Sequence, residues 1–336
     1  MKLFDAIQDR FQGGRTLAEL AKWLEYPEDE LRKWLGGMPA GSDASRYFYT
    51  QFAIPKRRGG SREIEAPSDD LKALQRRVLR KLIRPIPVHP AATGFVRGRS
   101  IVHNARPHAG QGVVINIDLR DFFPSISSQR VYKLWRAVGW GREASRILTN
   151  ICCHQERLPQ GAPTSPALSN LVCRKLDTRL AALVERAQET AVATRNLRTG
   201  EFTGSRKVAP IHGGRYTRYA DDLTFSFAEF GGAGTDSTSR AVLGSIRGIL
   251  EAEGFQIQMK KKVRVQRAHH RQTATGLIVN RVVNLPREAR RKIRAMQHRE
   301  RMGRLDAREK AQLRGWEALA RMVARQRALY FTAKST

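Results

Sequence analysis

Two adjacent aspartates, Asp221 and Asp222, lie between two segments with the residue patterns of β-strands. Residues 223–227 alternate between apolar and polar side chains, and residues 215–219 precede the pair, so the spacing predicts two strands joined by an acidic turn. Adjacent carboxylates repel one another unless a cation compensates them, and Mg²⁺ prefers carboxylates together with water and substrate phosphates. An Asp-Asp pair alone is also common in surface turns, so a metal site requires a further carboxylate.

The further carboxylate is Asp118, at the end of the apolar segment 112–119. This segment is typical of a strand that is buried on both faces. Two strands that present carboxylates to one point form a two-metal site suited to in-line phosphoryl transfer. We therefore expect Asp118, Asp221 and Asp222 to lie close together.

The net charge restricts the partners of the chain. Its 336 residues include 61 Lys and Arg against 31 Asp and Glu, which gives a formal charge of +30. With 41% hydrophobic residues the chain can form a packed core. The charge therefore indicates a globular protein that binds a polyanion, and nucleic acid is favoured over an anionic membrane surface.

The sequence also indicates a cellular compartment. No apolar stretch approaches the roughly 18 residues of a membrane-spanning helix. Asp5 and Asp9 interrupt the start of the chain, so we expect no signal peptide. Three cysteines without the spacing of a metal site are typical of a reducing compartment, and we expect the protein to be cytoplasmic.

The rest of the chain alternates between predicted helices and strands. Residues 16–35 predict two short amphipathic helices, which form either a DNA-reading helix-turn-helix or an ordinary packing unit. Residues 50–65 predict a hairpin with Gly59 and Gly60 at its turn. Further helices are predicted over 68–83, 130–138, 144–153, 166–187 and 241–254, extended segments over 255–265 and 275–283, and a basic insertion over about 188–214.

Residues 286–336 predict basic helices. From residue 287 onward there are 15 Lys and Arg against 5 Asp and Glu. Charge of one sign on a long helical segment favours a nucleic-acid-binding face over a merely solvated one. We expect Arg290, Arg291 and Arg294 to contact nucleic acid.

Several sequence blocks resemble those of bacterial reverse transcriptases, in the same order and at the same spacing. Residues 219–222 are similar to the YADD box of that family, and residues 118–126 to the block around its first catalytic aspartate. Residues 158–170 resemble its nucleotide-binding turn and helix. The fingers hairpin matches residues 54–64, and the palm block after the YADD box matches residues 254–257 with the lysines at 260–262.

Two shorter blocks resemble retron reverse transcriptases. Asn104 and His108 begin and end a segment of the form NAxxH, and Thr275-Gly276 is similar to a VTG block, although Ala274 replaces its valine. We expect Asn104 and His108 either to contact RNA or to make hydrogen bonds in the core. Thr275 and Gly276 are expected to contact nucleic acid, with a simple bulge as the alternative.

The resemblance implies an α+β right-hand polymerase with fingers, palm and thumb, in which helices flank an antiparallel palm sheet. The implied divisions are an N-terminal helical segment over 1–48, fingers over 49–110, a palm over 111–284 and a basic helical thumb over 285–336. Part of the fingers falls at about 125–160, and the insertion at 188–214 belongs to the palm segment.

The resemblance also implies the roles of individual residues. Asp118, Asp221 and Asp222 would be catalytic and, with the backbone carbonyl of Leu119, would hold two Mg²⁺ ions or Mn²⁺ in their place. Phe123 would exclude a 2′-hydroxyl from the sugar site, Phe122 would pack in the core, and Tyr219 would support the primer strand. The expected nucleotide-binding residues are Lys56, Arg62, Phe123, Gln160, Gly161, and either Lys261 or Lys262.

By resemblance, such an enzyme copies part of its own structured non-coding RNA into single-stranded DNA. It uses deoxynucleoside triphosphates, starts from an RNA 2′-hydroxyl and yields a branched RNA–DNA product, msDNA. Such systems serve in antiviral defence, with an effector protein encoded beside them. Two alternatives stay open: another bacterial reverse transcriptase (group II intron, diversity-generating or abortive-infection type), and a non-catalytic RNA-binding scaffold.

Overall fold

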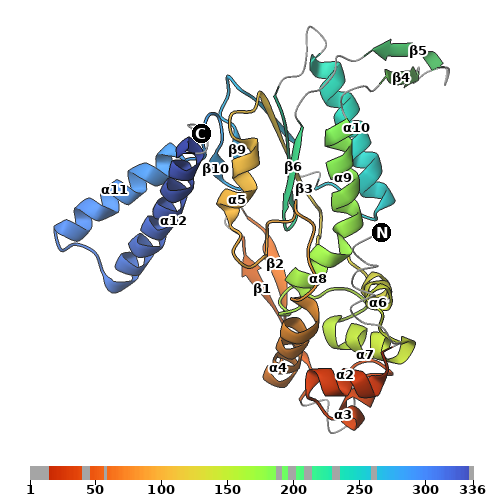
Figure 1. Ribbon diagram of the computed structural model, residues 1–336. Helices are drawn as coiled ribbons and strands as arrows, with labels where there is room; N and C mark the ends of the chain where they lie inside the picture. The colour runs from red at the N-terminus through yellow and green to blue at the C-terminus, as the bar shows by residue number, and fades with distance from the viewer. Residues whose placement is uncertain are drawn as a thin grey trace. The chain divides into compact units, whose positions relative to one another are not determined.

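The computed structural model describes residues 15–39, 46–56, 59–186, 191–195, 202–207, 214–228, 235–258 and 263–332 (Figure 1). The chain divides into two compact units. The first unit consists of residues 1–90 and 120–176, and the second of residues 91–119 and 177–336. Helix α9 (Arg174–Arg186) begins in the first unit and continues in the second.

The described part of the first unit begins with two short helices, α2 (Leu17–Leu24) and α3 (Glu28–Arg32), as predicted. The Glu19 amide donates to Thr16 Oγ1, and the Thr16 amide donates to the Glu19 carboxylate, so a capping box starts α2. Most apolar side chains of this region are buried and only Trp23 among the large ones is exposed, which agrees with a packing unit. The buried ones are Leu17, Leu20, Leu24, Leu31 and Trp34.

A hairpin and further helices complete the first unit. β1 (Tyr49–Pro55) pairs with β2 (Ser61–Pro67) across the predicted Gly59-Gly60 turn. The helices are α4 (Asp69–Val78), α6 (Ser128–Ala137), α7 (Arg142–Cys152) and α8 (Ser165–Val172).

Two of the predicted helices differ from the observed ones. The helix predicted over 68–83 is α4 followed by a π-helical segment, η2 (Leu79–Ile83). The helix predicted over 166–187 is divided into α8 and α9. The division is at Cys173, the C-cap of α8, whose ψ of 0° leaves the α-helical range.

The second unit is built on an antiparallel sheet with the strand order β6-β7-β3-β8, of which β3 and β6 are labelled in Figure 1. The central strand β3 (Val113–Asp118) is buried from Val113 to Ile117, as its apolar run predicts. It pairs with β7 (Asp222–Phe227) on one side and with β8 (Arg264–Arg267) on the other. β6 (Arg215–Tyr219) pairs with β7, so the predicted strand pair around the acidic turn is confirmed.

Helices accompany this sheet, which confirms the predicted fold class of an antiparallel sheet flanked by helices. They are α5 (Ile101–Ala105), the 3₁₀ turn η3 (Arg106–His108), α9 and α10 (Thr235–Ala252). The predicted insertion contains a separate hairpin, in which β4 (Ala191–Arg195) pairs with β5 (Phe202–Lys207).

The C-terminal helices are α11 (Arg287–Arg301) and α12 (Ala307–Thr332), where basic helices were predicted. The two extended segments predicted over 255–265 and 275–283 agree only in part with the described residues. The first contains the start of β8, with residues 259–262 outside the described ranges, and the second contains the two-residue β10 (Leu277–Ile278). β10 pairs with β9 (Thr273–Ala274) across a turn at Thr275-Gly276. One buried core joins these parts, and its members include Ala274, Leu277, Val283, Ile293, Leu313 and Val323.

None of the helices in the described ranges is long and apolar enough to cross a membrane. The implied boundaries of fingers, palm and thumb at residues 48, 110 and 284 stay predictions.

Candidate active site

The ends of β3 and β7 bring three aspartates to one end of the sheet. Asp118 and Asp222 are direct cross-strand partners, and Asp221 precedes Asp222 in the loop from β6. The Leu119 amide donates to the Asp221 carbonyl (3.0 Å), and the Gln258 amide donates to the Asp118 carbonyl (2.8 Å). These backbone pairings hold the three aspartates close together at one end of the sheet, as the sequence predicts.

The loop that carries Asp221 is strained. It has only two residues, Ala220 and Asp221, because Tyr219 pairs with Asp222. Ala220 has a φ of 58°, in the left-handed region that costs a residue with a side chain on the order of 1 kcal/mol. Such a turn persists only where surrounding contacts hold it.

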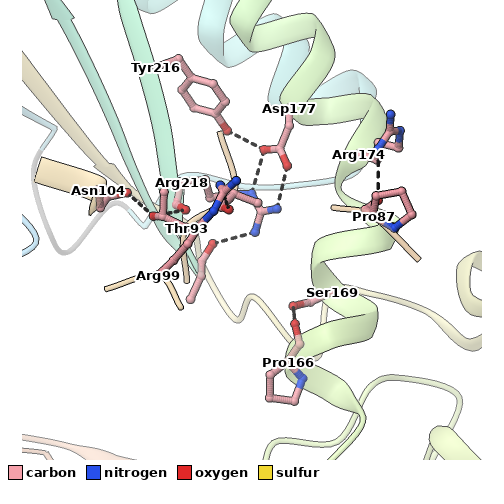
Figure 2. A network of polar contacts seen from close by, with 12 residues as sticks. Pro87, Thr93, Arg99, Asn104, Pro166, Ser169, Arg174, Asp177, Tyr216 and Arg218 are labelled. Carbon is pink, nitrogen blue, oxygen red and sulfur yellow. Dashed lines mark hydrogen bonds and ion pairs between the residues drawn. The ribbon is translucent and has the colours of Figure 1, made fainter. Parts of the chain in front are cut away.

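A buried ion pair holds this loop (Figure 2). Arg218 Nε donates to Asp177 Oδ1 (2.8 Å) and Nη2 donates to Oδ2 (2.7 Å), and neither side chain is exposed. The Tyr216 hydroxyl donates to Asp177 Oδ1 at 2.8 Å. Arg218 Nη1 donates to the Ala220 carbonyl at 3.4 Å. The guanidinium therefore connects α9 directly to the strained residue.

Residues 91–95 lie along β6 and the same loop. The Arg218 amide donates to the Ala91 carbonyl, and the Thr93 amide donates to the Arg218 carbonyl, both at 2.8 Å. A Cβ atom on Gly94 would lie 2.7 Å from the Ala220 nitrogen, closer than real Cβ atoms approach. Only glycine fits at position 94, because the backbone there is pressed against the loop.

His108 joins η3 to two strands of the sheet. Its ring nitrogens lie 2.7 Å from Ser226 Oγ on β7 and 2.8 Å from Thr217 Oγ1 on β6. Because the Thr217 hydroxyl donates to the Asn104 carbonyl (3.2 Å), it accepts from Nε2–H, and Nδ1 then accepts from the Ser226 hydroxyl. Burial lowers the pKa of His108 to about 3, and the charge of Arg215 adds to this effect.

Asn104 is also completely buried, and its Oδ1 accepts from the Thr93 hydroxyl at 2.7 Å (Figure 2). Of the two alternatives for Asn104 and His108, the structure shows hydrogen bonding in the core. Both residues support the strands that lead to Asp221 and Asp222.

The carboxylates at the sheet end suit a hard divalent cation. Directly opposed like charges such as Asp118 and Asp222 destabilise a sheet unless they are compensated. Within the described residues, no group of three or more His, Cys, Asp or Glu side chains is placed to hold a metal ion. This arrangement is compatible with Mg²⁺, which is usually bound through one or two carboxylates together with waters and substrate phosphates.

Comparison with known proteins identifies the family. The family model described as reverse transcriptase (RNA-dependent DNA polymerase) matches residues 54–280. This chain belongs to the reverse transcriptase family and is of the retron type. It is similar to the retron Mx65 reverse transcriptase of Myxococcus xanthus, at 39% identity over 302 residues that cover 83% of this chain and 62% of that protein.

Two further relatives agree. The retron Mx162 reverse transcriptase of Myxococcus xanthus is 36% identical over 347 residues, which cover 94% of this chain and 66% of the relative. The retron Ec86 reverse transcriptase of Escherichia coli is 36% identical over 258 residues, which cover 76% of this chain and 69% of that protein. The chain thus spans somewhat less than two thirds of the length of the two Myxococcus relatives.

The nucleotide-binding residues predicted for this reverse transcriptase fall mostly in the first unit. Lys56 and Arg62 are exposed on the β1–β2 hairpin, and Phe123 is partly exposed, whereas Phe122 is buried as predicted. The Glu65 amide donates to the Gln160 carbonyl at 2.9 Å. Gly161 has a φ of 148°, and a Cβ there would lie 2.5 Å from the Glu65 carbonyl oxygen, so the turn requires glycine.

The remaining predicted site residues have different environments. Thr275 and Gly276 both have positive φ and join β9 to β10, so they form a hairpin turn of type I′ character and not a simple bulge. Tyr219 lies beside Phe95, with ring centroids 6.3 Å apart. Lys261 and Lys262 lie outside the described residues. Arg290, Arg291 and Arg294 are exposed on α11.

Sequence reasoning did not identify Asp177, Arg218 or Gly94. Asp177 has a recognisable signal, because it falls on the apolar face of α9 that Leu180 and Val184 form. An acidic side chain on such a face requires a buried partner. Arg218 and Gly94 have no comparable signal, since their roles depend on contacts with residues distant in sequence.

We predict that Asp177→Asn lowers the free energy of unfolding by about 3–5 kcal/mol, because it leaves the Arg218 charge buried and uncompensated. Tyr216→Phe keeps the ring and loses one hydrogen bond to a charged group, which costs about 1.5–3 kcal/mol. Urea denaturation of both variants measures the difference. If both variants lose the same free energy of unfolding, or if Asp177→Asn loses no more than an exposed substitution would, the assigned role of the buried ion pair is contradicted.

We predict an acid-sensitive contribution from His108. Above about pH 6.5 the ring is neutral in both states, but below it the unfolded chain binds the proton first. The folded state then loses up to about 1.4 kcal/mol per pH unit until the pH approaches the folded pKa of about 3. His108→Gln keeps a donor and an acceptor without this titration. Urea denaturation between about pH 7 and pH 4 should give a shallower fall in unfolding free energy for the variant; identical slopes would refute the prediction.

Proposed function

We propose that this protein is an RNA-directed DNA polymerase that copies part of its own structured non-coding RNA into single-stranded DNA. The observation that carries the proposal is the opposed pair Asp118–Asp222, with Asp221 beside it, at the end of the sheet of a retron-type family member. Three carboxylates at one end of a sheet are unfavourable in a protein that only binds RNA. They repel one another, and they also repel the phosphates of RNA.

In the proposed mechanism Asp118, Asp221 and Asp222 would hold two Mg²⁺ ions, with the Leu119 carbonyl as a further ligand. When bound, such ions lower the pKa of the attacking hydroxyl and stabilise the charge that develops on the phosphoryl group. Ala220 and Arg218 keep the aspartates in position. Since little covalent chemistry falls to the protein, catalysis then depends on positioning and electrostatics.

Residues expected to bind the incoming nucleotide fall mostly in the first unit. Lys56 and Arg62 bind the triphosphate, for which the guanidinium fork of arginine is suited. Gln160 and Gly161 line the base-pair site, and Phe123 excludes a 2′-hydroxyl, so deoxynucleotides are preferred. Tyr219 supports the primer strand, and the lysine at 261 or 262 assists the pyrophosphate leaving group.

The finer part of the proposal concerns priming and partners. An RNA 2′-hydroxyl would start synthesis, so the product would be a branched RNA–DNA molecule. The named relatives, retron reverse transcriptases of Myxococcus xanthus and Escherichia coli, support this part. A cytoplasmic role in antiviral defence, with a neighbouring effector protein, belongs to the same proposal.

The test uses the protein expressed with its native upstream DNA, purified and incubated with labelled deoxynucleotides and Mg²⁺ but without added primer. We expect labelled DNA of fixed length that remains joined to RNA through a bond cleaved by debranching enzyme. Asp221→Ala with Asp222→Ala, or removal of Mg²⁺ by a chelator, should reduce incorporation by on the order of 10³-fold, because several kcal/mol of transition-state stabilisation is lost.

The controls separate the alternatives. Incorporation that requires an added RNA template and DNA primer would support a reverse transcriptase of another type and overturn self-priming. If neither substrate is extended while RNA binding persists, the protein is a non-catalytic scaffold. RNA binding by the double variant, measured in parallel, shows that the substitutions leave the rest of the protein intact.

A further inference from the structure

A second charged site lies in the first unit, apart from the residues assigned above. A cavity of about 350 Å³ opens between α4 and the segments around Tyr26 and Tyr47. Four arginines line it, Arg46, Arg76, Arg77 and Arg80, with Asp70 as its acidic lining residue. We call this set of residues the arginine pocket.

The arginine pocket holds more positive than negative charge. Arg46 Nε lies 3.3 Å from Asp70 Oδ2, so that arginine has a partner. The nearby Glu25 carboxylate pairs with Lys81 Nζ at 2.5 Å, and the charges of Arg77 and Arg80 act on the same carboxylate. Among the described residues, no carboxylate lies within 4.0 Å of the other three arginines of the pocket, Arg76, Arg77 and Arg80.

The pocket is also preorganised. Arg77 Nη1 donates to the carbonyl oxygens of Leu24 (3.0 Å) and Glu25, which orient the guanidinium without neutralising it. The same group lies 5.8 Å from the Tyr26 ring centroid. The Tyr26 and Tyr47 hydroxyls are 2.9 Å apart, and Tyr47 is buried, so this wall is anchored in the core. An anion would meet a positively charged wall that is already ordered.

The basic residues continue beyond the pocket from α4 into η2 and its C-cap. Arg76, Arg80 and Arg84 follow one another at intervals of four residues, and all three are exposed. Like charges at this spacing destabilise a helix by a few tenths of a kcal/mol per pair, roughly 0.2–0.5. The segment Leu79–Ile83 is π-helical. π-Helical segments are rare in proteins, and those that occur are often found at functional sites. The arrangement is unfavourable unless a polyanion lies against it.

We propose that the arginine pocket binds backbone phosphates of RNA. Guanidinium forks match pairs of phosphate oxygens, and such contacts fix the position of an RNA without reading its sequence. The choice of RNA as the occupant rests on the proposed function, whereas the phosphate chemistry is independent of it. A free phosphate ion would use the same chemistry, so the test must separate the two.

The test measures the affinity of the full chain for a labelled RNA hairpin at several salt concentrations. The variant is Arg76→Ala with Arg80→Ala, both exposed positions in helix where alanine is well tolerated. The matched control is Arg142→Ala with Arg146→Ala, an exposed pair at the same spacing on α7 of the same unit, also without an ion pair among the described residues. Both variants remove the same charge, and thermal melts confirm that both fold.

We expect the pocket variant to bind the hairpin several-fold more weakly. Its plot of log affinity against log salt should be shallower by about 1.4–1.8, since each lost phosphate contact changes that slope by about 0.7–0.9. The control should change the slope by less than half as much. Arg76→Lys with Arg80→Lys, which keeps the charge, should retain the slope.

Equal changes in the pocket variant and the control would overturn the proposal, because they would reflect net charge alone. The second arm is calorimetry with inorganic phosphate. If phosphate binds to the pocket but the pocket variant leaves the salt dependence of RNA binding unchanged, the pocket binds a small anion and the proposal is overturned. Hairpin binding is measured without nucleotides. The inference therefore survives or fails independently of polymerase activity.

Discussion

The ion pair between Arg218 and Asp177 has no contact with water, and the second unit is organised around this constraint. A buried charge is tolerated only when its partner and further hydrogen bonds replace the lost hydration. Here α9 supplies the carboxylate, β6 supplies the guanidinium and Tyr216, and Ala220 supplies a carbonyl. The pair can therefore form only when these parts assemble together, and their assembly also sets the conformation of the loop that carries Asp221.

The strand β6 shows how this constraint reaches both faces of the sheet. Side chains alternate along a strand, so Tyr216 and Arg218 point to one face and Thr217 to the other. One face is connected to Asp177 on α9 and the other to His108 and the Asn104 carbonyl near η3. β6 is an edge strand of the sheet, and residues 91–93 cover its backbone at Arg218. An edge that carries the proposed catalytic loop is thus protected from pairing with other chains.

Much of this architecture could be predicted from local patterns. Period-2 alternation and the acidic turn predicted the β6–β7 hairpin, and the apolar run predicted the buried strand β3. The NAxxH block gave two alternatives for His108, because a motif specifies a residue type and not its burial. The break at Cys173 and the π-helical segment were missed, since apolar spacing there fits a continuous α-helix as well. The partner of Asp177 lies 41 positions away in sequence, and only the folded chain reveals it.

The π-helical segment has a consequence for how this region can change in evolution. The Arg84 amide bonds to the Leu79 carbonyl, five positions earlier, so the turn contains one residue more than an α-helical turn would. Deleting one residue between them would restore an α-helix and rotate α4 by about 100° relative to the chain after Arg84. Arg76 and Arg77 would then turn away from Arg84. At this point of the chain a single-residue deletion would alter the charged surface more than most substitutions.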